Sequence, residues 1–529
     1  MRYPIPAQTR TNQRRASDPE VSAWVSAHAG SGKTHVLTQR VVRLLLAGVA
    51  PSRLICLTFT KAAAANMSAR VFGMLAGWTL ADDETLRAKI EETGARPPHN
   101  LDDARKLFAA AVETPGGLKI QTIHAFCERV LHLFPFEANV PAEFRAAEDL
   151  ERAELLALAR RETFEAAAND AILGAALARV AEETSEGGFE TILNAALAQR
   201  EALDDVETLI ARLPAALELS SDDDEASIRR AIVEDGIHWS EWRAIAVTLE
   251  GGSANDKKQA LKLRQAAERA PDSACIEDYF SLFFTQKGAP LERVATNNIA
   301  KIAPDLPRKL IEEGQRLLAL RDKLRVVWTL DRTIALLRLA AACLQRYEAL
   351  KRTHGVLDFD DLIERTRALL TREGAAAWTL YKLDRGVDHI LVDEAQDTSE
   401  AQWAILEALA SEFTSGAGAR LQRRTFFAVG DEKQSIFSFQ GASPQSFGRM
   451  RNLFRARVEA ADQTFDPVPL ELSFRSARNI LDAVDLVFSS PEARKGLNAD
   501  PQEPPPRHSA LKHDIPGMVE IWEPIAGSK

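Results

Sequence analysis

Residues 27–34 constrain the fold of this chain more than any other segment. They follow a short apolar run, 24–26, and precede a segment with helical periodicity, 36–46. A strand, a tight glycine-containing loop and a helix in this order form a cradle whose backbone N–H groups point at anionic oxygens. The segment therefore predicts a phosphate site. On its own it leaves one alternative open, a surface turn that happens to contain glycine and lysine.

Two side chains at the end of this loop have the chemistry of a nucleotide site. We expect Lys33 to reach the terminal phosphates and the Thr34 hydroxyl to hold Mg²⁺. Ala27 stands where the pattern GxxxxGK[ST] has its first glycine, and alanine fits there if its φ angle is negative. The residues whose backbone is expected to surround the phosphates are Ala27, His28, Ala29, Gly30, Ser31 and Gly32.

Composition limits the class of protein. A chain of 529 residues, 46% hydrophobic and 27% charged, predicts two to four globular domains. Its four cysteines are far apart, which indicates buried thiols in a reducing compartment rather than disulfides or a zinc site. With no run of about 18 apolar residues and no apolar leader, we expect no membrane span and a cytoplasmic location. The net charge of −10 argues only weakly against nucleic acid, because a local basic groove is compatible with it.

The hydrophobic pattern changes along the chain. From about residue 144 to residue 347, apolar residues recur every three or four positions, which predicts helices. Outside this region, compact apolar runs predict buried strands of a parallel α/β sheet that collects polar residues at the carboxyl ends of its strands. These runs are 24–26, 54–59, 118–122, 389–392, 425–429 and 470–472.

An acidic pair follows one of these runs. Asp393 is expected to hold Mg²⁺, and Glu394 to polarise the attacking water. An Asp-Glu pair after a strand is also common as a helix cap, but a phosphate loop in the same chain argues against that alternative. Lys33 and Asp393 lie 360 residues apart, and a helical insertion between strands explains this spacing.

Several segments, in one order, resemble the UvrD/Rep helicases of superfamily 1, and most closely the AddA-type helicase–nuclease subunits of bacterial double-strand-break repair. The resemblance implies a RecA-like P-loop NTPase motor domain with a large all-α insertion, plus the start of a second RecA-like domain. The segments are Gln13 and residues 27–34, 57–67, 122–126, 357–362, 392–398, 429–442 and 472–476. The implied bounds are 1–143 and 351–465 for the first motor domain, 144–350 for the insertion and 466–529 for the second motor domain.

The resemblance also implies roles at the nucleotide. Gln13 reads the adenine edge, and Phe474 stacks on the adenine. Gln434 senses the γ-phosphate, and Arg475 stabilises the phosphate during transfer. The positions that match the family's phosphate, metal and base residues are Lys33, Thr34, Asp393 and Glu394.

On the DNA side, the resemblance implies that Phe59, Phe437 and Phe439 touch single-stranded DNA bases. Base–aromatic stacking tolerates any sequence, although a phenylalanine at a strand end is as often a core residue. Residues implied to contact the DNA backbone or to line the same groove are Thr58, Thr60, Lys61, Thr122 and His124.

Some positions depart from the family pattern. Gln440 stands where many relatives carry arginine, Asn66 replaces a common glutamate, and Ser473-Phe474 replaces Asn-Tyr. None of these changes removes a group that phosphoryl transfer needs.

The implied function is an ATP- and Mg²⁺-dependent 3′–5′ DNA helicase motor that acts on single-stranded and duplex-end DNA with a second, AddB-like subunit. One alternative is a stand-alone UvrD-type repair helicase without a nuclease. Another is a nucleotide-gated DNA-binding or assembly module without helicase activity. The family's remaining motor motifs and nuclease are expected beyond residue 529, so we expect these 529 residues alone to unwind DNA poorly.

Overall fold

The central sheet is formed by segments from both ends of the chain. The computed structural model describes residues 3–182, 184–285, 287–372, 375–384, 386–411, 413, 423–436, 441–495 and 507–523. The sheet has six strands in the order β3-β2-β6-β7-β1-β8, and every neighbouring pair is parallel, which confirms the predicted parallel sheet. The strands are β1 Ser22–Ala27, β2 Leu54–Thr58, β3 Lys119–Thr122, β6 His389–Val392, β7 Thr425–Gly430 and β8 Phe465–Leu470.

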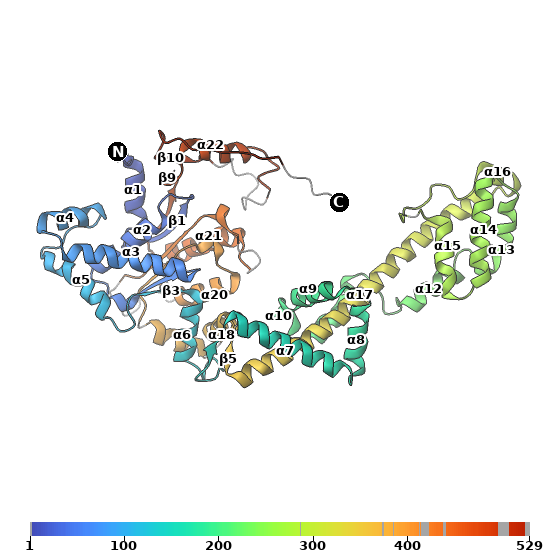
Figure 1. The fold of residues 1–529 in the computed structure, drawn as a ribbon, viewed down its shortest axis with the longest axis horizontal. Coiled ribbons are helices and arrows are strands. Elements are labelled where there is room, and N and C mark those ends of the chain that lie inside the picture. The colour runs from blue at the N-terminus through green and yellow to red at the C-terminus, as the bar shows by residue number, and fades with distance from the viewer. Residues whose placement is uncertain are drawn as a thin grey trace. The chain divides into compact units, whose positions relative to one another are not determined.

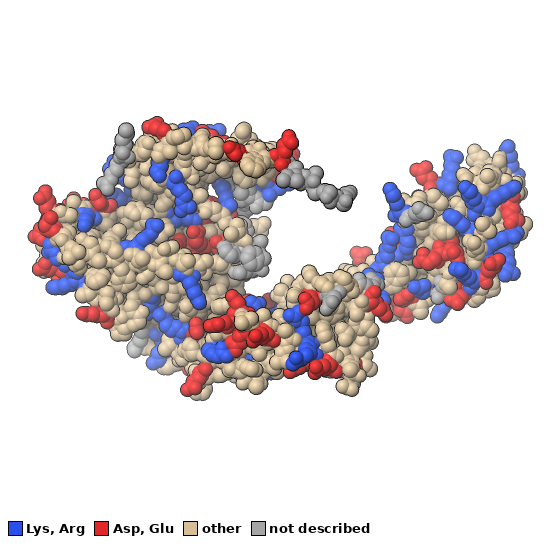
Figure 2. All heavy atoms as spheres, in the orientation of Figure 1, with Lys and Arg blue, Asp and Glu red and all other residues tan. Residues whose placement is uncertain are grey.

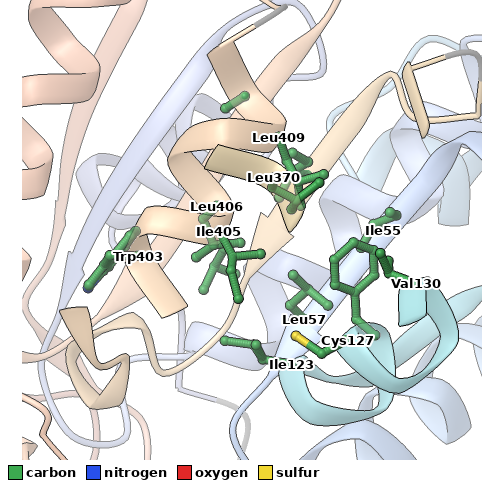
Figure 3. Packing of buried hydrophobic residues seen from close by; sticks show 14 of the residues in the cluster. Ile55, Leu57, Ile123, Cys127, Val130, Leu370, Trp403, Ile405, Leu406 and Leu409 are labelled. Carbon is green, nitrogen blue, oxygen red and sulfur yellow. The ribbon is translucent and has the colours of Figure 1, made fainter. Parts of the chain in front are cut away.

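Helices cover both faces of this sheet, because successive strand residues point to opposite sides. In β6, Ile390 and Val392 belong to one core cluster, whereas Leu391 belongs to the other. Figure 3 shows part of the first cluster, with Cys127 and Leu406 among the residues that converge between helix and sheet. Helices α6, α18, α20 and α21 supply the first cluster, and α2, α3, α4 and α5 supply the second.

Side-chain caps begin several of these helices. Thr60 accepts a hydrogen bond from a backbone N–H of α3, and Thr122 does the same for α6. No described helix has the length and apolarity needed to cross a membrane. The helices packed around the sheet or near it are α1 Ala7–Ala16, α2 Lys33–Leu46, α3 Lys61–Thr79, α4 Asp83–Glu92, α5 Leu101–Glu113, α6 Ile123–Leu133, α18 Phe359–Thr371, α19 Ala375–Asp384, α20 Glu400–Ser411, α21 Pro444–Ala460 and α22 Arg478–Val487.

The last strand of the sheet differs from the sequence-based expectation, which placed a run at 470–472. Strand β8 begins earlier, at Phe465, and contains Pro467 and Pro469. Proline cannot donate to a ladder of hydrogen bonds, but β8 is an edge strand that pairs only with β1 in this sheet, where proline is tolerated. The residues after it form the short strand β9 Leu472–Ser473, which pairs with β10 Ser509–Ala510.

The chain divides into two compact units: unit 1 comprises residues 1–148 and 355–529, and unit 2 comprises residues 149–354. In unit 1, the short strands β4 Arg145–Ala146 and β5 Val356–Leu357 pair in parallel next to the two points where the chain leaves and re-enters this unit. The family-derived domain bounds remain predictions.

The regular elements described in unit 2 are helices, with one isolated bridge between Phe284 and Pro290. Its longest helix, α17, has 49 residues, which corresponds to roughly 74 Å. Figure 1 shows the other helices of unit 2 arranged along α17. The helices are α7 Asp149–Ala167, α8 Ala171–Ala181, α9 Glu186–Leu197, α10 Arg200–Leu203, α11 Val206–Ala216, α12 Glu225–Glu234, α13 Trp242–Glu250, α14 Ala254–Arg269, α15 Ile276–Phe283, α16 Asn297–Ile302 and α17 Leu306–His354.

Candidate active site

The loop between β1 and α2 turns on two glycines. Gly30 and Gly32 have φ angles of 72° and 92°, which glycine adopts without the steric cost that a side chain would add. The backbone N–H and the hydroxyl of Ser31 both donate to the carbonyl oxygen of His28, at 3.1 and 2.7 Å. These bonds close the loop on itself just before the helix begins.

The two ends of the loop have ordinary backbone. Ala27 is the last residue of strand β1 and has no positive φ, so alanine is accommodated where the pattern has glycine. Lys33 and Thr34 are the first residues of α2. The N–H groups of a first helical turn have no partner within the helix and carry its positive dipole end, so they are suited to bind an anion.

The segment after β9 packs directly against this loop. The backbone N–H of Phe474 donates to the carbonyl oxygen of Gly30 at 2.8 Å. A Cβ atom on Gly30 would lie 2.8 Å from Cβ of Arg475 and 2.9 Å from Oγ of Ser473, so only glycine fits. Arg475, which is 445 positions after Gly30 in the sequence, thus lies next to the loop. The Ser473 hydroxyl lies against the same glycine.

Gln13 and Phe474, expected at the adenine, both lie next to Gly32. A Cβ atom on Gly32 would lie 3.7 Å from Nε2 of Gln13 and 3.8 Å from Cε2 of Phe474. Gln13 is buried in helix α1 Ala7–Ala16. An amide, which can both donate and accept hydrogen bonds, and a flat ring therefore lie near the start of α2.

Asp393 follows strand β6 and is almost fully buried. Its backbone N–H donates to the carbonyl oxygen of Leu57 at 2.9 Å, which continues the ladder between β6 and β2. Burial and the neighbouring Glu394 carboxylate raise the pKa of Asp393 to about 6. A buried carboxylate with a raised pKa gains strongly from a nearby cation.

Glu394 has an unusual backbone and a charged partner. Its φ and ψ angles are 49° and 45°, a left-handed conformation that is rare for residues other than glycine and is often found at functional sites. Its Oε2 atom lies 2.8 Å from Nζ of Lys33. The predicted base and the predicted phosphate-binding lysine are therefore in direct contact.

The predicted Mg²⁺ ligands, Thr34 and Asp393, fit the donor set that this ion prefers. Mg²⁺ takes one or two carboxylates and completes its shell with water and phosphate oxygens. Within the described ranges, no cluster of three or more His, Cys, Asp or Glu side chains is placed to hold a metal without such help. A single buried aspartate beside the phosphate loop matches a metal that arrives with its nucleotide.

Gln434 lies just after strand β7, and its Nε2 donates to Oδ2 of Asp431. Our sequence-based interpretation did not include Gln396, which hydrogen-bonds to Glu394 and to the backbone N–H of Asp431. The signals available were its position two residues after the glutamate and its place in the segment 392–398, which resembles the family. It connects the residues that follow β6 with those that follow β7.

The three threonines expected at the DNA have structural hydrogen bonds. Thr58 and Thr122 are register partners at the carboxyl ends of β2 and β3. The Thr58 hydroxyl donates to the carbonyl oxygen of Thr60 at 3.0 Å, and both Thr60 and Thr122 cap helices. These bonds explain the three residues without DNA, so their DNA contacts remain a prediction.

The other described candidates at the DNA lie near these threonines in the chain. The ring of His124, the second residue of α6, meets the ring of Phe359 edge to face at 5.3 Å, and burial lowers the His124 pKa. Phe59 is half-buried, whereas Lys61 is exposed at the start of α3. The candidates that lie outside the described residues are Phe437 and Phe439.

His28 has a neighbour that the sequence did not indicate. Its ring lies 4.8 Å from the ring of His508, whose Nδ1 pairs with Oδ1 of Asp485. Burial, together with the nearby charges of Lys433 and His508, lowers the pKa of His28. The loop therefore packs against residues close to the end of the described chain.

Comparisons with known proteins agree with this geometry. Residues 9–455 match the family model described as the UvrD/REP helicase N-terminal domain. An ATP-dependent helicase/nuclease subunit of Enterococcus faecalis is 27% identical over 511 residues, covering 89% of this chain and 37% of the relative. The proteins of the same name from Lysinibacillus sphaericus and Geobacillus kaustophilus are 27% identical over 515 and 516 residues, each covering 88% of this chain and 38% of the relative. The chain thus spans less than two fifths of the length of these relatives.

Proposed function

The chain belongs to the UvrD/Rep helicase family, and on this premise we propose that it is the ATP-hydrolysing motor of a DNA helicase that acts in repair. The observation that carries the proposal is the 2.8 Å contact between Nζ of Lys33 and Oε2 of Glu394. These residues come from segments 361 positions apart, and the pair joins a phosphate-binding lysine to an acid that can accept a proton.

The chemistry proposed for the site is phosphoryl transfer from ATP to water. Lys33 and the N-terminus of α2 bind the phosphates, and Glu394 orients the attacking water and takes up its proton. Arg475 approaches from the segment packed on Gly30 and stabilises charge on the phosphate. Thr34 and Asp393 would hold Mg²⁺, which neutralises phosphate charge when it is bound.

The finer features of the proposal rest on the family. We infer translocation along single-stranded DNA in the 3′–5′ direction, with Phe59 and the surfaces after β2 and β3 at the DNA. Duplexes with either a 3′ or a 5′ single-stranded tail test the polarity in a protein that also carries the family's remaining motor motifs, since these 529 residues alone are expected to unwind DNA poorly. Only the 3′-tailed substrate should be unwound. Preference for the 5′-tailed duplex would contradict it.

We also propose a place in a helicase–nuclease of double-strand-break repair. The relatives are each named as one subunit of a helicase/nuclease, which supports a second, AddB-like partner. The four buried, unpaired cysteines support a reducing compartment such as the cytoplasm. Co-purification of this chain with an AddB-like protein from the same organism is the measurement that checks the partnership.

The central test is the substitution Lys33→Ala. We expect ATP turnover in the presence of single-stranded DNA to fall by about a hundredfold or more, because the phosphates lose their cation. Lys89→Ala on α4 is the matched control, since Nζ of this lysine donates to the carbonyl oxygen of Gly77, outside the proposed site, and this variant should stay within about twofold of wild type.

Two outcomes would overturn the proposal. Turnover in Lys33→Ala close to that of wild type would move the site elsewhere. Nucleotide binding without any DNA-stimulated turnover in the wild-type chain would favour the nucleotide-gated binding module instead.

A further inference from the structure

Gln396 lies in the short turn Ala395–Asp397 that follows the acidic pair, and it is only 2% exposed. Its Nε2 donates to Oε2 of Glu394 and to Oδ2 of Asp397, each at 3.0 Å. Its Oε1 accepts from the backbone N–H of Asp431 at 2.9 Å. Both N–H groups and the carbonyl of this amide are therefore in use.

A glycine at the end of β7 keeps the space for this amide. A Cβ atom on Gly430 would lie 2.6 Å from Oε1 of Gln396 and 2.9 Å from Cε2 of Phe447. Any larger residue at this position would displace the Gln396 side chain. The Ser435 hydroxyl also donates to the backbone carbonyl of Gln396 at 3.3 Å, so main chain and side chain are both held.

The hydrogen bonds continue from Gln396 to the predicted γ-phosphate sensor. Asp431, whose N–H meets Gln396, accepts a hydrogen bond from Nε2 of Gln434 through its side chain. An unbroken path of hydrogen bonds thus runs from Glu394 through Gln396 and Asp431 to Gln434. The path joins the ends of β6 and β7, which are neighbours in the sheet.

Glu394 depends on such a restraint. Its left-handed backbone is held by its surroundings and not by intrinsic preference. Its other side-chain partner is Lys33, whose proposed task is to bind phosphate. When Lys33 serves the phosphates, the Gln396 amide is the contact that keeps the carboxylate in place.

We propose that Gln396 is a positioning residue that orients the Glu394 carboxylate and links it, through Asp431, to the sensor Gln434. The inference rests on the proposed ATPase function of this site. Gln396 acts through Glu394 and does not itself touch the nucleotide. Its loss therefore lowers the rate of the chemical step and leaves nucleotide affinity intact.

The test is Gln396→Met in the full chain, since methionine keeps the volume and removes all three hydrogen bonds. We expect kcat for DNA-stimulated ATP hydrolysis to fall by about ten- to thirtyfold, with KM within about threefold of wild type. The dissociation constant of a fluorescent N-methylanthraniloyl-ADP should stay within about twofold. Gln402→Met is the matched control, because Gln402 is a buried amide on α20 whose Oε1 accepts from the backbone N–H of Ser399, and its kcat should stay within about twofold.

A second pair of variants separates positioning from charge. Gln396→Glu keeps the acceptor for Asp431 but removes both donors and adds a negative charge. Combining it with Asp397→Asn restores the total charge of the cluster. We expect kcat of this double variant to remain about tenfold low, because Glu394 still lacks its donor.

Several results would overturn the inference. They are a wild-type kcat in Gln396→Met, a proportional loss of nucleotide affinity in that variant, recovery of kcat in the charge-restored double variant, and strictly additive effects of Gln396→Met and Gln434→Ala. An inactive Lys33→Ala together with a fully active Gln396→Met would reject this inference alone. An active Lys33→Ala would reject the proposed function as well.

Discussion

Buried carboxylates in the two units have opposite surroundings. In unit 2, Asp256 is fully buried and accepts hydrogen bonds from the backbone N–H and hydroxyl groups of both Ser253 and Thr296. Burial by itself would raise its pKa, but these hydrogen bonds outweigh burial and lower it. In unit 1, burial and the Glu394 charge raise the pKa of Asp393 to about 6.

The difference separates a structural acid from one that is suited to bind a cation. Asp256 has its charge satisfied by donors and ties helix α14 to the segment before α16. Asp393 has a neighbouring negative charge and gains from a cation instead. On the surface of unit 2, lysine, arginine and acidic side chains are interspersed in Figure 2, which is typical of a solvated surface.

Among the substitutions that test the difference between the two kinds of buried acid, Glu394→Gln is expected to have the largest effect. Removing the proton acceptor should lower ATP turnover by about a thousandfold. The free energy of unfolding should stay within about 1 kcal/mol of wild type, because the pair with Lys33 is partly exposed and Asp393 loses a repulsive neighbour. Single-turnover hydrolysis and urea unfolding measure the two quantities.

The exposed Glu400→Gln on α20 serves as the control for this prediction and should keep turnover within about twofold. A Glu394→Gln protein that hydrolyses ATP at a tenth of the wild-type rate or faster would remove the distinction between the two kinds of acid.

In unit 2, the substitution Glu313→Leu is expected to lower the stability of the fold, whereas Glu394→Gln lowers turnover. Glu313 accepts hydrogen bonds from the Tyr279 hydroxyl at 2.7 Å, the Ile237 N–H at 3.3 Å and the Arg316 guanidinium at 2.7 and 2.9 Å. Leucine would leave the Tyr279 hydroxyl and the Ile237 N–H buried without this acceptor. The free energy of unfolding should fall by about 3 kcal/mol.

Urea unfolding followed by tryptophan fluorescence checks this value, with the exposed neighbour Glu312→Gln as the control. An unchanged midpoint for Glu313→Leu would mean that the buried acid of unit 2 is not structural after all.

A smaller effect concerns a buried histidine in the sheet of unit 1. Burial, with the nearby Arg40 charge, lowers the pKa of His389 to about 4, and its Nδ1 lies 2.8 Å from Oγ1 of Thr425. The unfolded chain binds a proton below about pH 6.5, whereas the folded chain does not until about pH 4. Stability is therefore lost as the pH falls through this window, by about 1 kcal/mol between pH 7.5 and 5.5.

His389→Asn should reduce this pH dependence by that amount relative to wild type, and the exposed His99→Asn should not. Urea unfolding at the two pH values gives the comparison. Equal pH dependence in His389→Asn and wild type would count against a neutral buried histidine.

Short-range patterns predicted much of the fold. The run 389–392 coincides with strand β6, because its three consecutive apolar residues, 390–392, in a buried parallel strand leave a clear signal. Strand β8 was missed in large part, because Pro467 and Pro469 argue against a strand unless it lies at an edge. Whether a strand is an edge depends on its neighbours, which the local sequence does not contain.

In the candidate site too, some features follow from the local sequence and others depend on distant parts of the chain. Residues 27–34 and the acidic pair at Asp393 were identifiable from the sequence, since each depends on its own loop or strand end. The role of Gln396 was not, because its partners, apart from adjacent residues, belong to a strand end 35 positions further along.

By itself, the sequence determined a phosphate loop, an acidic strand end and the family to which both belong. Only the tertiary structure decided that Lys33 touches Glu394 and that Arg475 packs on Gly30. The physical reason is that the parallel sheet brings the carboxyl ends of distant strands to one edge. Which side chains meet there depends on packing between segments hundreds of residues apart.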